Sequence, residues 1–99
     1  MTAPFTHGNP DLIAKAKAES VQFYGMAGRG VTAPGAVVIR HLPHNEMHPY
    51  VVHFANTQLG GYHGGEYCET MDEAKRRAVE RAVRYDPDGV LNAAYRRHR

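Results

Sequence analysis

The sequence predicts a single α+β domain over residues 1–99, in the order α-β-β-β-α, with a three-stranded antiparallel sheet packed against the helices. Residues 36–68 hold three runs rich in β-branched and aromatic side chains, joined by short links that favour antiparallel pairing. A helix start is indicated before these runs and another after them. Ninety-nine residues, 42% of them hydrophobic, suffice for one modest core and are too few for a second domain.

The first helix is expected to begin at Asn9. Its side chain can cap the helix, Pro10 suits the first helical position because it lacks an N–H group, and Asp11 faces the positive helix end. An approximate apolar stripe over residues 12–24 predicts that the helix continues to Tyr24. Gly25 is expected to end it.

Three strands are predicted after a flexible loop over residues 25–35, which contains four glycines and a proline. The strands cover residues 36–42, 50–55 and 62–68, and residues 43–49 form a polar hairpin loop. The pair Gly64-Gly65 within the third strand indicates a bulge or a place where another backbone comes close. Without the bulge, alternation in that strand places one group of side chains opposite His63 and Tyr67, namely Tyr62, Glu66 and Cys68.

The second helix has the clearest local signal, a capping box at residues 70–73 in which Thr70 and Glu73 satisfy each other's backbone N–H groups. Small residues at helical spacing allow this helix to lie close to the sheet: Ala74, Ala78 and Ala82. The basic residues are expected nearer solvent, and residues 86–89 end the helix. One further helical turn is possible over residues 90–95.

Charge is divided unevenly along the chain, because residues 75–99 hold eight of the twelve basic residues and only three acids. This end, including the basic tail at residues 96–99, favours an acidic partner, which could be nucleic acid or protein. A solvated helix face that binds nothing is equally compatible with the pattern.

Five of the seven histidines lie between residues 41 and 63, yet no metal site, cofactor or catalytic group is expected. Structural zinc generally needs four closely paired ligands that include cysteine, and the single cysteine, Cys68, lies beyond the cluster. His53 or His63 could act as a base for Cys68. His63 and Cys68 fall on opposite faces of a regular strand, although a bulge at Gly64-Gly65 could restore a common face. The sequence therefore predicts a protein that is not an enzyme.

One cysteine excludes an intrachain disulfide, which fits a reducing compartment. The longest apolar run, residues 36–39, is far shorter than the roughly 20 residues of a membrane-spanning helix. We therefore expect a cytoplasmic protein without membrane contact.

The stretch from Tyr50 to Ala82 resembles the β-β-α core of the double-stranded-RNA-binding domain through a helix pattern at Glu73, Ala74, Lys75, Ala78 and Ala82. It also resembles the plant-type ethylene-response DNA-binding domain at Thr70, Glu73, Ala74, Ala78, Ala82, Leu91 and Asn92. The chain departs from the first family at Met71 and Asp72, where that family has lysines. The second family reads DNA with a sheet rich in arginine and tryptophan, whereas this chain has no tryptophan and a single arginine, Arg40, in its predicted strands. The resemblances imply a similar fold, and the nucleic-acid contacts do not carry over.

Residues 48–74 are similar to small uncharacterised accessory proteins of phages and plasmids. That resemblance implies action by binding, and some such proteins inhibit host defence systems that include CRISPR complexes. We therefore expect a non-enzymatic binding protein of a mobile genetic element that occludes a surface of a host or phage protein complex, in the manner of an anti-CRISPR or other anti-defence inhibitor. The alternative is a nucleic-acid-binding regulator that uses the basic helix over residues 71–85.

The expected partner-binding residues are aromatic, histidine and arginine side chains, since aromatics are enriched in interface hot spots. They are Tyr62, His63, His53, Arg76, Arg77, Arg81 and Arg84. Tyr50 and Tyr67 could also contribute, but we expect both in the core.

Overall fold

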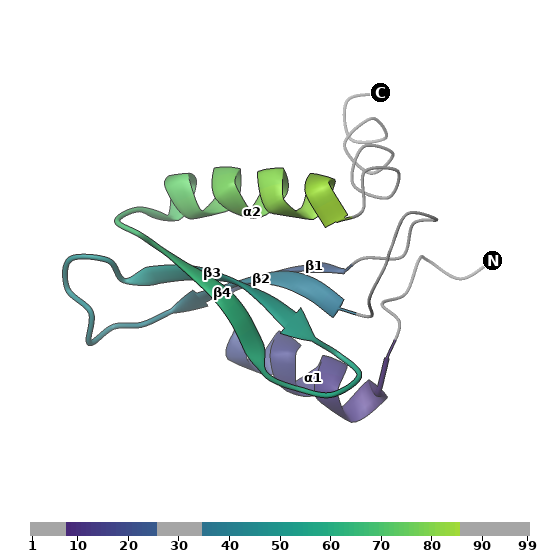
Figure 1. The fold of residues 1–99 in the computed structure, drawn as a ribbon. Coiled ribbons are helices and arrows are strands. Elements are labelled where there is room, and N and C mark those ends of the chain that lie inside the picture. The colour runs from purple at the N-terminus through teal and green to yellow at the C-terminus, as the bar shows by residue number, and fades with distance from the viewer. Residues whose placement is uncertain (1–7, 26–34, 86–99) are drawn as a thin grey trace, which may run out of the picture.

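The computed structural model describes residues 8–25 and 35–85, which form two helices and a four-stranded antiparallel sheet (Figure 1). The elements are α1 (Pro10–Glu19), β1 (Gln22–Gly25), β2 (Gly35–His41), β3 (Tyr50–Asn56), β4 (Tyr62–Cys68) and α2 (Met71–Tyr85). The strands lie side by side in chain order, and the two helices cover opposite faces of the sheet (Figure 1). The α+β class is confirmed, with one strand more than predicted. Neither described helix is long and apolar enough to cross a membrane.

The additional strand, β1, replaces the predicted end of the first helix. The Asn9 cap is confirmed, since its Oδ1 accepts a hydrogen bond from the Asp11 N–H at 2.8 Å. However, α1 ends at Glu19, Ser20 is extended, and β1 pairs with the stretch of β2 from Ile39 back to Ala36. The helix prediction for residues 20–24 is wrong because hydrogen bonding to the edge of β2 outweighs a weak local pattern.

Several predicted features lie wholly or largely outside the described residues. Gly25 ends β1 and Gly35 begins β2, and the rest of the predicted glycine-rich loop is not described. The predicted helix end at residues 86–89, the further turn at residues 90–95 and the basic tail at residues 96–99 are also outside the described part of the chain.

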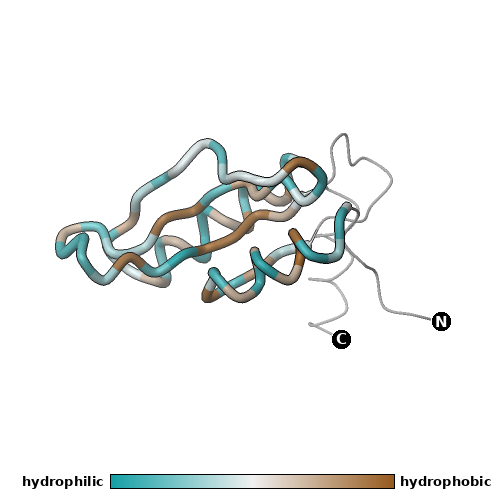
Figure 2. The backbone as a smooth tube through the Cα atoms, turned by 90° about the horizontal axis from the view of Figure 1, so that it is seen from below, coloured by the Kyte–Doolittle hydropathy of each residue, from teal (hydrophilic) through white to brown (hydrophobic). Residues whose placement is uncertain are grey.

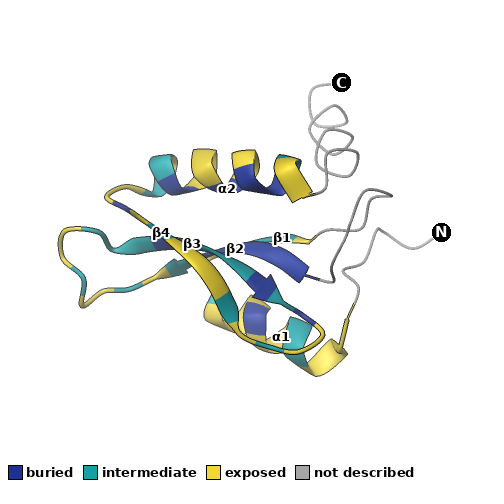
Figure 3. Cartoon of the chain, viewed as in Figure 1, coloured by how far each residue is buried: buried dark blue, intermediate teal, exposed yellow. Residues whose placement is uncertain are grey.

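The core is divided between the two faces of the sheet (Figure 3). The α2 side is the larger: Val37, Ile39, Val52 and Cys68 pack against Ala74, Ala78 and Ala82, all fully buried. The α1 side consists of Ala16, Ala36, Val38 and Ala55, with Phe23 and Tyr62 packed against them. The most hydrophobic segments of the chain lie in the two central strands (Figure 2). The alanine spacing thus acts as predicted, because small side chains let α2 approach the sheet closely.

At the start of α2, one of the two hydrogen bonds of the predicted capping box forms. The Thr70 Oγ1 atom accepts a hydrogen bond from the Glu73 N–H at 3.1 Å. The Glu73 carboxylate accepts from Arg77 Nε at 3.2 Å in place of the Thr70 N–H. One turn of spacing brings Arg77 within reach, so an ion pair along the helix replaces the reciprocal half of the box.

A bulge between β3 and β4 decides which side chains share a face. The pairing register shifts between Val52 and Phe54, and Gly64 lies opposite the shift with φ +62°. Tyr62 pairs with Ala55 and packs on the α1 side, whereas Glu66 pairs with Val52 on the α2 side. The predicted bulge is confirmed, and the expectation that Tyr62 shares a face with Glu66 and Cys68 is wrong because the extra residue reverses the alternation.

Candidate functional site

Arg81 is a buried cation that packs against the bulge. Its side chain comes from the sheet-facing side of α2, and the residue is 8% exposed. The guanidinium donates hydrogen bonds to the carbonyl oxygens of Val52 (3.3 Å), His63 (3.0 Å) and Gly64, and to Glu66 Oε2 (3.4 Å). A bulge disrupts the regular ladder, and Arg81 supplies donors to carbonyls at that point. The prediction that Arg81 lies near solvent is wrong for this reason, and its predicted role in partner binding stays a prediction.

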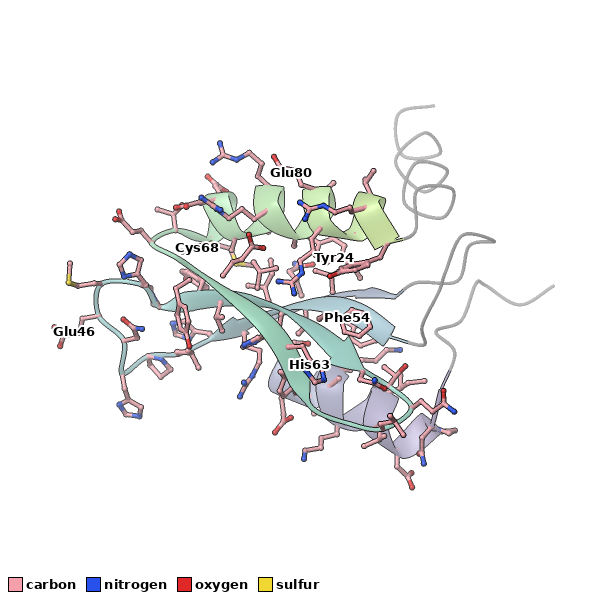
Figure 4. All side chains as sticks on the ribbon, in the orientation of Figure 1. Tyr24, Glu46, Phe54, His63, Cys68 and Glu80 are labelled. Atoms are coloured by element: carbon pink, nitrogen blue, oxygen red, sulfur yellow. The ribbon has the colours of Figure 1, made fainter. Side chains whose placement is uncertain are left out.

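The remaining basic residues of α2 form no continuous positive strip. Arg77 pairs with Glu73 on its own helix and with Glu66 on β4, at 3.2 and 3.7 Å. The other cations of α2 are exposed and make no ion pair within residues 8–25 and 35–85: Lys75, Arg76 and Arg84. Asp72 and Glu80 are exposed among them, with Glu80 on the outer side of the helix (Figure 4). The outer face of α2 therefore carries mixed charge.

A second polar group lies on the α1 side of the sheet. We call it the Arg40 cluster, and it consists of Glu19 from α1, Arg40 from β2, His53 from β3 and Tyr62 from β4. The Arg40 guanidinium carbon lies 4.4 Å from the centroid of the Tyr62 ring, a cation–π geometry. The His53 ring lies 5.5 Å from the same centroid, and the Tyr62 hydroxyl donates to Glu19 Oε1 at 2.5 Å. Tyr62 is thus the centre of the cluster.

The Arg40 cluster contains polar atoms without hydrogen-bond partners and two side chains with shifted pKa values. Arg40 Nε and His53 Nδ1 are both buried and have no hydrogen-bond partner in the described part of the chain. Burial, and then the charge of Arg40, lower the pKa of His53, which favours the neutral imidazole. Burial and the hydrogen bond to Glu19 raise the pKa of Tyr62 to about 12, so its hydroxyl keeps its proton. Arg40 is therefore a half-buried cation without a counter-ion among the described residues.

The structure brings together two of the predicted partner-binding residues and separates a third. His53 and Tyr62 meet in the Arg40 cluster, as just described. His63 lies on the opposite face, where its ring is 6.5 Å from that of Phe54 (Figure 4). This separation follows from the regular alternation of a strand, because Tyr62 and His63 are neighbours in β4 and pair with Ala55 and Phe54 before the bulge.

The two tyrosines expected in the core behave differently. Tyr50 is half-buried and packs against the α2-side core, as expected. Tyr67 is 54% exposed, so its expected core position is wrong. It pairs with Val51, which in turn pairs with Arg40, and these three residues share the α1 side. Figure 1 shows α1 beneath the end of the sheet opposite the β2–β3 hairpin, so this helix covers only part of the α1 side.

Sequence reasoning missed Arg40 and Glu19 as members of a site. Arg40 had a usable signal, because it directly follows the apolar run at residues 36–39 of the same strand and faces the same side as Val38. Glu19 had none, since it reaches Tyr62 across 43 residues of sequence. Only the packing of α1 on the sheet brings the two together.

The geometry offers little for nucleophilic chemistry. Cys68 is fully buried, burial raises the pKa of its thiol, and its Sγ contacts the Glu66 carbonyl at 3.7 Å. A buried, protonated thiol is a poor nucleophile. Within residues 8–25 and 35–85, no group of three or more histidine, cysteine, aspartate or glutamate side chains could hold a metal ion.

The fold and the Arg40 cluster define a small α+β protein whose sheet carries a cation, a neutral imidazole and tyrosine rings on the side that α1 partly covers. No protein-family model matches the chain, and no match is found among curated proteins or solved structures. The surface is therefore characterised by its own chemistry: an aromatic platform with one cation that has no acceptor among the described residues.

Proposed function

We propose that this chain is a non-enzymatic binding protein that occupies a surface of a partner protein, and that it binds through the Arg40 cluster and the neighbouring Tyr67. The observation that carries this proposal is the Arg40 guanidinium, which is stacked on Tyr62 and lacks an acceptor in the described chain. Arginine and tyrosine are among the side chains enriched at protein interfaces. Stacking also holds the guanidinium in place before binding, which lowers the entropy cost of association.

The chemistry of the described residues supports binding over catalysis. The candidate nucleophile, Cys68, packs on the α2 side, whereas the Arg40 cluster lies on the α1 side. His53 therefore has no thiol beside it to activate. An exposed tyrosine and a half-buried arginine instead resemble the anchors of an interface.

The partner class follows from the resemblance of residues 48–74 to accessory proteins of phages and plasmids. On that basis we propose a host or phage protein complex as the partner. An inhibitor of a host defence system, such as a CRISPR complex, is the sharpest form of the proposal.

The test is affinity capture of the tagged chain from host lysate, with and without nuclease. We expect a stoichiometric protein partner that survives nuclease treatment and is lost with Arg40→Gln. Arg76→Gln is the matched control, because it removes an exposed arginine of α2 that makes no ion pair with the described residues. Capture should survive that change.

The opposite pattern would replace the proposal with nucleic-acid binding by α2. In that case Arg76→Gln would weaken binding, Arg40→Gln would not, and nuclease would remove the captured material. Micromolar, salt-sensitive binding to a duplex by the purified chain would have the same meaning, because phosphate contacts release counter-ions.

A further inference from the structure

The Arg40 cluster has the composition of a receptor for one negative charge. From its geometry we infer that it binds a single carboxylate of an acidic side chain on the partner, with Arg40 forming the ion pair and His53 an adjoining hydrogen bond. This inference rests on the proposed function, because it names the group on the partner that the surface recognises.

Arg40 is oriented by a contact that leaves its donors available. A guanidinium carries five N–H donors in its plane, and stacking on an aromatic ring occupies the face of that plane. The guanidinium carbon lies 4.4 Å from the Tyr62 centroid, and Arg40 Nε is buried, so the terminal Nη groups are the donors left for a carboxylate. A carboxylate accepts two parallel N–H bonds from such a fork.

No carboxylate within the described residues fills this role. Glu19 is the acid of the cluster, and the Tyr62 hydroxyl donates to it at 2.5 Å. Arg40 forms no ion pair with Glu19 or any other described residue. A half-buried cation that lacks an acceptor is costly, so an arriving carboxylate gains more here than at a hydrated surface arginine.

His53 provides a second donor on the same side of the sheet. Both side chains contact Tyr62, and their buried, unpaired nitrogens are His53 Nδ1 and Arg40 Nε. An incoming carboxylate therefore meets His53 Nε2 and the Nη groups of Arg40, because the two buried atoms are out of its reach. A neutral imidazole donates one hydrogen bond and adds no second charge. The pair therefore suits a group that carries one negative charge and more than one acceptor lone pair.

Charge favours a carboxylate over a phosphate chain. A nucleic-acid backbone needs several cations along its path, whereas Arg40 is the one cation of the cluster. Lys17, on α1, is occupied over the Phe23 ring at 5.3 Å. Glu19 also lies against Tyr62, and its negative charge opposes a dianion more than a monoanion.

The experiment is an NMR titration of the ¹⁵N-labelled full chain, which observes the side-chain Nε–H of Arg40 and the ring nitrogens of His53. The probes are a capped peptide with one glutamate among alanines, the same peptide with glutamine, and inorganic phosphate. We expect a saturable shift of both side chains with the glutamate peptide. The glutamine peptide should bind at least about tenfold more weakly, since it loses a charge-assisted pair.

Two variants serve as controls. Arg40→Lys keeps the positive charge and loses the planar fork, so it should weaken the glutamate response. Lys75→Gln removes an exposed cation of α2 and should leave the response unchanged. The backbone amide spectrum of each variant shows whether the variant keeps the fold. If a variant does not fold, the titration of the unmodified chain with the three probes still tests the inference.

Three results would overturn the inference: a stronger response to phosphate than to the glutamate peptide, equal responses to the two peptides, or signals of Arg40 and His53 that are insensitive to every probe. The last would show that water or the chain itself provides the acceptor. If the peptide fails while Arg40→Gln still abolishes capture, the carboxylate inference fails and the proposed function stands. If the peptide binds but no protein partner is captured, the proposed function fails.

Discussion

Replacing Arg81 with methionine tests the main structural result, that this arginine serves the bulge. Methionine keeps most of the aliphatic stem and removes the guanidinium. The change withdraws donors from three backbone carbonyls and from the Glu66 carboxylate. No other element of the fold is altered directly, so the loss in stability reports the value of these contacts.

The size of the effect follows from the burial of each acceptor. The bond to the Val52 carbonyl is buried, and an unpaired buried carbonyl costs about 1–3 kcal/mol. The carbonyls of His63 and Gly64 are partly buried and recover water in part, so each adds roughly 0.5–1 kcal/mol. The ion pair with Glu66 adds little to the loss in stability, because the Glu66 side chain is exposed to solvent. Removing a buried charge offsets some of the loss, which leaves about 3 kcal/mol.

Chemical denaturation with a thermal melt is the assay. A loss of about 3 kcal/mol corresponds to a fall in Tm of roughly 12–24 °C for a domain of this length. Arg77→Met is the matched control, because that arginine lies one turn earlier, contacts the same Glu66 and is exposed. It should cost less than about 1 kcal/mol. Arg81→Lys should recover only part of the loss, since an ammonium lacks the planar fork.

Equal losses for Arg81→Met and Arg77→Met would refute the reasoning. They would mean that water satisfies the carbonyls at the bulge equally well. The buried position of Arg81 would then be a consequence of the fold and would contribute nothing measurable to its stability.

Three further predictions use the same assay. Thr70→Ala should cost about 0.5–2 kcal/mol by removing the acceptor for the Glu73 N–H, whereas Thr70→Ser should be close to neutral; equal stabilities would contradict the observed cap. Gly64→Ala should cost at least about 1 kcal/mol, because its φ of +62° disfavours a side chain and the new Cβ would meet the Arg81 guanidinium; an unchanged unfolding midpoint would contradict this. The fold lowers the pKa of His53 below its ordinary value of 6.5, so His53 of the unfolded chain takes up a proton at a higher pH than His53 of the folded chain. The free energy of unfolding is therefore highest above pH 6.5 and decreases as pH falls from 6.5 through the folded pKa. His53→Gln should flatten this decline in Tm between neutral and mildly acidic pH, and parallel declines in both proteins would exclude His53 as its source.

The candidate site was only partly accessible from sequence. His53 and Tyr62 were identified as aromatic and imidazole side chains of the sheet, and they do meet. Arg81 was assigned to the surface because helical spacing cannot reveal carbonyls that a bulge presents from 17 and 18 residues earlier in the chain. The contact between Arg40 and Tyr62 could not be predicted from the sequence, because the pairing of β2, β3 and β4 brings the two residues together.

The sequence by itself determined the elements whose signals are local. Capping side chains marked the starts of both helices, β-branched runs marked β2 and β3, and a glycine pair marked the bulge in β4. The tertiary structure alone decided the strand at residues 22–25, the burial of Arg81 and the assembly of the Arg40 cluster. A four-residue strand exists only where a sheet edge supplies its hydrogen bonds, and a charged side chain is buried only where distant backbone carbonyls converge on it. Both conditions depend on contacts between segments far apart in the chain, which no local pattern of residues encodes.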